Sequence, residues 1–177
     1  MEKAITEKNM TMTGTLAPLL PHLRRYARAL CGSQSDGDGY VRATLSALAN
    51  GEKDLPTDVP AKLGLYQIFH TVWLNARGEG ADQVSSISDL PAARRLHVLS
   101  VLDRAALLLT AVEGFDLGDA ACILGETPQA VERAIVAAQQ AIEKQLATCV
   151  LIIEDESIIA LDLEQMVTGL GHEVVAI

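Results

Sequence analysis

Aromatic residues are scarce in this chain, which has two Phe, three Tyr and one Trp among 177 residues. Ala and Leu dominate the apolar positions instead, and such a composition favours helices that pack at close range. No stretch approaches the ~20 consecutive apolar residues that a membrane-spanning helix needs. The start of the chain, MEKAITEKNMTMTG, is polar and lacks the apolar centre of a signal peptide. We therefore expect a cytoplasmic protein that does not engage a membrane.

Residues that carry chemistry are few and scattered. The three cysteines (Cys31, Cys122 and Cys149) form no CxxC pair and have no His at the spacing of metal ligands. Since cytosolic disulfides are rare, we interpret these cysteines as reduced thiols. The sequence also has no nucleophile–base–acid pattern and no Gly loop of the kind that holds phosphate groups. We therefore expect that the protein is not an enzyme.

Positive charge is also in short supply, because the net charge is −9 at pH 7. A protein whose main task is to grip nucleic acid usually carries a basic face. A negative total can hide a local basic patch, so the charge must be examined again at any motif that resembles a DNA-binding element.

The first half of the chain predicts a bundle of three helices over residues 15–76, after a disordered start at residues 1–14. Apolar residues recur here at steps of three and four, which places them on one face of each helix. The buried faces are predicted to consist of Leu16, Leu19, Leu20, Leu23, Tyr26 and Leu30 in the first helix, Val41, Leu45 and Leu48 in the second, and Leu65, Ile68, Phe69, Val72 and Trp73 in the third. Gly32 should end the first helix, and residues 35–38 offer N-caps for the second.

A Gly-, Ser- and Asp-rich segment at residues 77–88 predicts a flexible linker to a second helical unit at residues 89–148. The predicted elements of this unit are a helix capped by Asp103, a short helix Asp119–Leu124 closed by Gly125, and a long helix Pro128–Leu146 capped by Thr127. A short helix, a Gly turn and a long helix form the helix-turn-helix pattern.

The periodicity changes after Thr148. The apolar run CVLII predicts a buried strand, residues 158–170 predict a helix, and EVVAI predicts a second, parallel strand. This β-α-β unit, residues 149–177, is the opening unit of a doubly wound sheet. The predicted fold is therefore mostly α, with two small helical bundles followed by an incomplete α/β domain, whose apolar strand edges are expected to be unpaired and prone to association.

The last segment, VLIIEDESIIALDLEQMVTGLGHEVVAI, resembles the start of response-regulator receiver domains. The resemblance implies that Glu154 and Asp155 match the acidic pair that binds Mg²⁺ beside a phosphorylatable Asp. Hard cations such as Mg²⁺ prefer carboxylate oxygens, although an acid pair can also be a simple polar end to a strand. The family's phosphoacceptor Asp, and its later Thr/Ser and Lys, have no counterpart among these residues, so we expect the Mg²⁺ site to be incomplete in this chain and to hold no metal.

The two helical units resemble regions 2 and 4 of extracytoplasmic-function sigma factors. Region 2 is similar to PHLRRYARALCGSQSDGDGYVRATLSAL, and region 4 to LSVLDRAALLLTAVEGFDLGDAACILGETPQAVERAI. A sigma-like module joined to a receiver is the layout of PhyR-type general stress response regulators. The resemblance implies an anti-anti-sigma factor, in which phosphorylation of the receiver by a sensor histidine kinase or phosphotransfer protein lets the sigma-like module sequester a NepR-type anti-sigma factor.

The predicted recognition helix departs from that of a working sigma factor. Between Pro128 and Leu146 the only basic residues are Arg133 and Lys144, and residues 95–148 hold four basic and seven acidic residues, a net charge of −3. A helix that reads DNA needs basic side chains for phosphates and base edges. We therefore expect no specific DNA binding, although a DNA-binding sigma-like transcription regulator stays the alternative function.

The sequence pattern reduces the residues that would contact an anti-sigma factor to a small set of candidates. Such factors lay amphipathic helices on apolar surfaces, so the candidates for partner binding are Leu65, Phe69, Val72, Trp73, Ile135 and Val136. Each of them also fits a place in a helical core. The basic residues Arg24, Arg25 and Arg28 are compatible with nucleic-acid binding, but a solvated helix face is the simpler interpretation.

Overall fold

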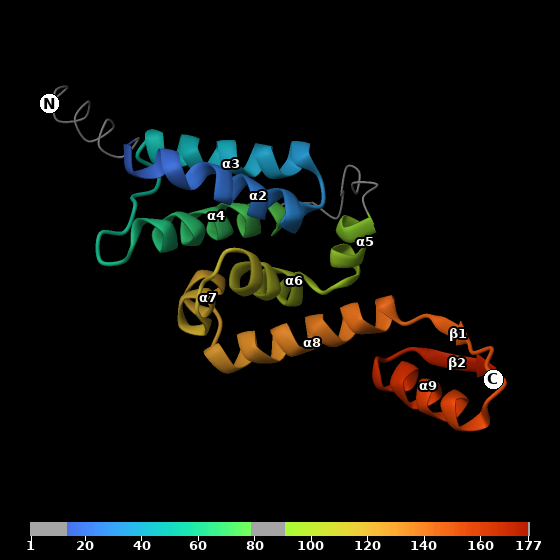
Figure 1. Ribbon diagram of the computed structural model, residues 1–177. Helices are drawn as coiled ribbons and strands as arrows, with labels where there is room; N and C mark the ends of the chain where they lie inside the picture. The colour runs from blue at the N-terminus through green and yellow to red at the C-terminus, as the bar shows by residue number, and fades with distance from the viewer. Residues whose placement is uncertain (1–13, 79–90, 177) are drawn as a thin grey trace, which may run out of the picture.

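The computed structural model describes residues 14–78 and 91–176. Figure 1 shows two helical layers, one above the other, and a small β-α-β unit beyond the far end of the longest helix. The predicted disorder at residues 1–14 lies outside the described residues except for Gly14, which begins a helical turn. The predicted linker at residues 77–88 lies outside them too, except that Arg77 and Gly78 are helical and so were wrongly assigned to the linker.

The first layer contains the predicted three helices. Its elements are η1 (Ala17–Leu19), α2 (Leu20–Cys31), α3 (Gln34–Ala49) and α4 (Ala61–Gly78). Gly32 ends α2 with a left-handed backbone, φ 80°. A Cβ atom at this position would also lie 1.8 Å from Nε2 of His97 in the second layer, so the imidazole ring would have to move to make room for it. The side chain of Ser33 caps α3 by accepting a hydrogen bond from the Asp36 amide, so the cap predicted at residues 35–38 was wrong.

The second layer contains the predicted helix-turn-helix. Its elements are α5 (Pro91–Val98), α6 (Val101–Leu107), η2 (Leu108–Val112), α7 (Leu117–Leu124) and α8 (Pro128–Leu146). The bounds of α8, the Thr127 cap and the left-handed Gly125 are confirmed. The cap of α6 is Ser100 and not Asp103, whose amide donates to the Ser100 hydroxyl. The last turn of this helix, η2, widens into a π-helix.

The two layers share one hydrophobic core. Buried residues form a continuous cluster from Leu16 in the first layer to Ala134 in α8. Helix α4 packs against α7, and α2 packs against η2. The ring of Tyr66 in α4 meets the ring of Phe115 at 5.0 Å between centroids, which joins the layers through an edge-to-face aromatic pair. The two predicted bundles are therefore one packed body rather than two units that meet only through a linker.

The C-terminal unit consists of β1 (Cys149–Leu151), α9 (Ser157–Gly169) and β2 (Glu173–Ala176). The strands pair in parallel, with Val150 opposite Val174, which confirms the predicted β-α-β unit. Within the described residues each strand has one partner strand, so each keeps one unpaired edge, as expected. Helix α9 covers one face, where Ile152 and Ala160 are buried, and leaves Ile153 89% exposed. The prediction of a buried strand was wrong for β1 itself, in which Cys149 and Leu151 are exposed and Val150 is half-buried. Among the described residues no helix is both long enough and apolar enough to cross a membrane.

Candidate protein-binding surface

The outward face of α8 is the surface that would meet DNA in a helix-turn-helix protein. Its core-facing side carries Val131, Ala134 and Ala138, all buried. Its exposed side carries an acidic, basic and neutral mixture that consists of Glu132, Arg133, Val136, Ala137, Gln139, Gln140, Glu143 and Lys144. Since two basic residues and two acidic ones share this face, it offers no positive stripe for a phosphate backbone.

Three of the predicted partner contacts belong to the core. Leu65, Phe69 and Trp73 are buried in α4, so they offer no surface to a partner in this conformation. Val72 and Ile135 are half-buried beside the same core. Val136 is 45% exposed, which makes it the predicted contact with the most accessible apolar surface.

Other exposed apolar residues were missed by the sequence analysis. Leu74, Val98, Val112 and Leu117 are all more than a third exposed. Val112 and Leu117 flank the turn between η2 and α7. Periodicity does not predict the exposure of such residues well. An apolar residue at the end of a helix can stand in line with the buried stripe and still be exposed. Only Leu74, which follows the buried Trp73 directly, stands off the stripe of its helix.

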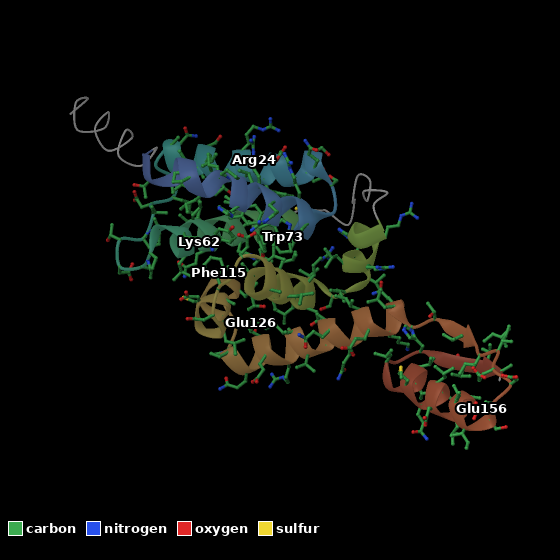
Figure 2. The ribbon with its side chains drawn as sticks, in the orientation of Figure 1. Arg24, Lys62, Trp73, Phe115, Glu126 and Glu156 are labelled. Carbon is green, nitrogen blue, oxygen red and sulfur yellow. The ribbon has the colours of Figure 1, made fainter. Side chains whose placement is uncertain are left out.

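The basic residues of α2 are engaged in ion pairs. Arg28 donates to both carboxylate oxygens of Asp38 in α3, with the shorter N–O distance 2.7 Å, and Arg24 lies 3.6 Å from the same carboxylate. The hydrogen bond from Arg28 lowers the pKa of Asp38. Figure 2 shows Arg24 in the first layer, on the side away from the second. Arg24 and Arg28 thus form a half-exposed ion-pair face, and neither residue is a free cation for nucleic acid.

Arg25 makes a different contact, because it reaches Glu113 at the end of η2. The side chain of Glu113 is fully buried, with 0% of its surface exposed. Its Oε1 accepts hydrogen bonds from Nε and Nη2 of Arg25 at 3.1 and 2.9 Å. Its Oε2 accepts one from the Tyr66 hydroxyl at 2.8 Å. Burial, followed by this hydrogen bond, raises the pKa of Tyr66 well above its ordinary range.

The backbone beside Glu113 is held from the first layer too. Lys62 of α4 donates to the Glu113 carbonyl at 2.5 Å, and its Nζ lies 4.4 Å from the centroid of the Phe115 ring. Figure 2 shows Lys62 and Phe115 next to one another where the layers meet. Arg25 also donates to the Val112 carbonyl at 3.2 Å. The sequence analysis missed this cluster because Glu113 lies 47 to 88 residues from its three partners in the chain. Its one signal is an acid inside the apolar run LLLTAVEGF.

A buried polar pair lies deeper in the first layer. The Tyr26 hydroxyl and Nε2 of His70 are 2.5 Å apart. Burial lowers the pKa of His70 to about 4 and raises that of Tyr26 well above its ordinary value. The imidazole is therefore neutral near pH 7, and its Nε2 can accept a hydrogen bond from the Tyr26 hydroxyl.

The acidic pair lies just after β1. Oε1 of the half-buried Glu154 accepts a hydrogen bond from the Glu156 amide at 3.1 Å, and Asp155 is exposed. No group of three or more His, Cys, Asp or Glu side chains gathers around a possible metal position among the described residues. Mg²⁺ demands near-octahedral oxygen ligands, so these two carboxylates alone do not make a complete site.

Comparison with known proteins identifies both helical units. A family model for the Sigma2 domain of PhyR matches residues 16–70, and a model for the sigma-like domain of the response regulator PhyR matches residues 96–145. The Phyllosphere-induced regulator PhyR of Methylorubrum extorquens is 44% identical over 159 residues, which are 89% of this chain and 59% of that protein. The chain thus spans about three fifths of the length of this relative.

Solved structures give the same relationship. PhyR of Bartonella quintana, described as an anti-anti-sigma factor and solved with the anti-sigma factor NepR, is 37% identical, with a TM-score of 0.75 over 93% of this chain and 62% of that one. The same Bartonella protein solved alone gives a TM-score of 0.57, over 93% of this chain and 60% of that one. The sigma factor RpoE of Bartonella quintana, in its complex with NepR, shares the fold at 23% identity, with a TM-score of 0.61 over 74% of this chain and 93% of that one.

Proposed function

Because this chain belongs to the PhyR family, we propose that its sigma-like part binds a NepR-type anti-sigma factor in place of a sigma factor. One observation carries this proposal: the chain keeps the fold of a sigma factor, yet on the outward face of α8 two acidic side chains balance the two basic ones, which leaves no positive stripe for reading DNA. A protein that has the shape of a sigma factor without its DNA contacts can still bind an anti-sigma factor.

The arrangement of the elements supports the same proposal. The described structure is closer to Bartonella PhyR in its NepR complex than to the same protein alone, with TM-scores of 0.75 and 0.57 at equal coverage of this chain. A molecule that already has the arrangement of the complex binds its partner without first shifting between states. We therefore propose that the sigma-like part of this chain is ready to bind.

The consequence would be a partner switch. An anti-sigma factor held by this chain would leave its sigma factor free to engage RNA polymerase, which places the action in the cytoplasm. The β-α-β unit resembles the start of a receiver domain, so we propose that phosphotransfer from a sensor histidine kinase or a phosphotransfer protein regulates the whole protein. Glu154 and Asp155 would contribute two of the oxygen ligands for Mg²⁺ in a complete receiver.

A titration with the cognate NepR-type protein tests the binding. We expect a one-to-one complex, with no specific binding of a promoter duplex at physiological salt in a parallel titration. The change Val136→Glu places a charge on the most accessible predicted contact, and the loss of an apolar interface contact of this kind costs about 2 kcal/mol or more. Gln140→Glu, which adds the same charge one turn away at another exposed position of α8, is the matched control.

Two results would contradict the proposal. The first is undetectable binding to the anti-sigma factor at tens of micromolar. The second is sub-micromolar, sequence-specific binding to promoter DNA at physiological salt, which would favour a DNA-binding regulator instead. Equal losses of affinity in the two α8 variants would show that Val136 acts only through charge.

A further inference from the structure

Glu113 is a buried carboxylate whose hydrogen-bond partners all come from the other layer. Arg25 lies on α2, and Lys62 and Tyr66 lie on α4, while Glu113 itself follows η2. A buried charge is costly unless it is paired and hydrogen-bonded. The second layer therefore carries a group that is satisfied only while the first layer stays in place.

The same partners cap the end of a helix. The last carbonyl groups of a helix have no partner within it, and the helix dipole makes this end partly negative. Here Arg25 donates to the Val112 carbonyl and Lys62 to the Glu113 carbonyl. Two cations from the first layer thus neutralise a carboxylate and a helix end of the second layer.

The π-turn η2 gives Glu113 its place at the junction. The Glu113 amide donates to the Leu108 carbonyl, five residues back, and the Phe115 amide donates to the Leu109 carbonyl, six residues back. The wider turn adds a residue relative to an α-helix, and such turns recur at functional sites. After it, Gly114 has a left-handed backbone, φ 73°, which turns the chain so that Phe115 returns to the ring of Tyr66.

We propose that Arg25, Lys62, Tyr66 and Glu113 form an interlayer lock that fixes the orientation of the helix-turn-helix relative to the first layer. These four are positioning residues: the lock holds both surfaces ready for one anti-sigma partner that contacts both layers. The effect on the partner rests on the proposed function, whereas the fixed orientation is a property of the chain alone.

The first experiment measures the orientation without any partner. Spin labels are attached to Ser46→Cys in α3 and Gln140→Cys in α8, both exposed positions, after replacement of the three natural cysteines. The lock predicts one narrow distance distribution in the parent chain and a clearly broader one in Arg25→Met. Arg24→Met is the matched control, because Arg24 is the neighbouring arginine on α2 and its ion pair among the described residues is with Asp38, within the first layer. Its distribution should stay narrow.

A second variant distinguishes loss of the lock from unfolding of the protein. Glu113→Gln keeps the size of the side chain and removes its charge, and far-ultraviolet circular dichroism checks that both variants stay helical. Distributions in Arg25→Met and Glu113→Gln that are as narrow as that of Arg24→Met would overturn the proposal, because packing alone would then fix the layers.

The second experiment measures affinity for the NepR-type protein with unlabelled variants. The lock predicts a loss of about tenfold in Arg25→Met and none in Arg24→Met. A broader distribution with unchanged affinity would overturn the positioning role. Absence of binding by the parent chain would instead contradict the proposed function, and the distance measurement would still decide whether the lock exists.

Discussion

At the scale of the residue, His70 is a titratable group that the fold keeps neutral. It is buried among aromatic rings, with the rings of Phe69 and Trp73 at 5.9 and 5.5 Å between centroids. Its Nε2 meets the hydroxyl of Tyr26. Protonation would place a positive charge in this cluster and would remove the acceptor, so burial lowers the pKa of His70 from 6.5 to about 4.

This shift predicts a dependence of stability on pH. Between pH 6.5 and about 4 the unfolded chain binds a proton at His70 and the folded chain does not, so the free energy of unfolding falls as the pH falls. The stabilisation is fully present above pH 6.5, and its loss reaches about 3 kcal/mol near pH 4, at 1.36 kcal/mol per pKa unit. Urea unfolding across this range should show a flatter profile for His70→Gln. Parallel profiles for the two proteins would contradict the assignment.

Residue-scale features that depend on near neighbours were predictable from the sequence. Gly32, Gly125 and Thr127 act as expected because a helix end is decided within a few residues. The two wrong caps share one cause. Ser33 and Ser100 each stand three residues before an acid, and the serine is the cap while the acid takes the third helical position. Glu113 was not predictable as a lock, because its partners are distant in the sequence.

At the scale of the element, α8 was predicted to the residue and its function was predicted from what its outer face lacks. The residues of its inner face were not predicted, although Ala134 and Ala138 are buried and stand one helical turn apart. Whether Val72 and Ile135 belong to the core or the surface was not predictable, since both are half-buried beside other elements. Periodicity identifies a face and not the depth at which that face is covered.

The β-α-β unit leads to a prediction about phosphate. Glu154 and Asp155 are the only candidate ligands of the predicted Mg²⁺ site, and the described residues add no third one. We expect this 177-residue chain to bind Mg²⁺ weakly and to show the same affinity for the NepR-type protein with and without acetyl phosphate and Mg²⁺. The measurement is a titration under both conditions, with Asp155→Asn as a control that should change neither value. A clear gain of affinity with the phosphodonor would contradict it.

At the scale of the whole molecule, the sequence predicted two sigma-like bundles and did not predict that they share one core. The apolar stripes of separate helices fix which residues are buried, but the same stripes suit two small cores or one large one. In the structure the core is shared, because the ring of Phe115 in the second layer packs against the ring of Tyr66 in the first. The contact joins residues far apart in the chain, and periodicity within a helix carries no information about it.

The shared core gives the proposed partner switch a physical basis, because a partner that meets both layers finds them already in a fixed relation. Competition for the anti-sigma factor tests this account most directly. A complex of the NepR-type protein with a fluorescent cognate sigma factor is titrated with this chain, and fluorescence anisotropy reports the free sigma factor. We predict release of the sigma factor as the chain approaches one equivalent, and less release with Val136→Glu than with Gln140→Glu. A sigma factor that stays bound at tens of micromolar of the chain would contradict the account.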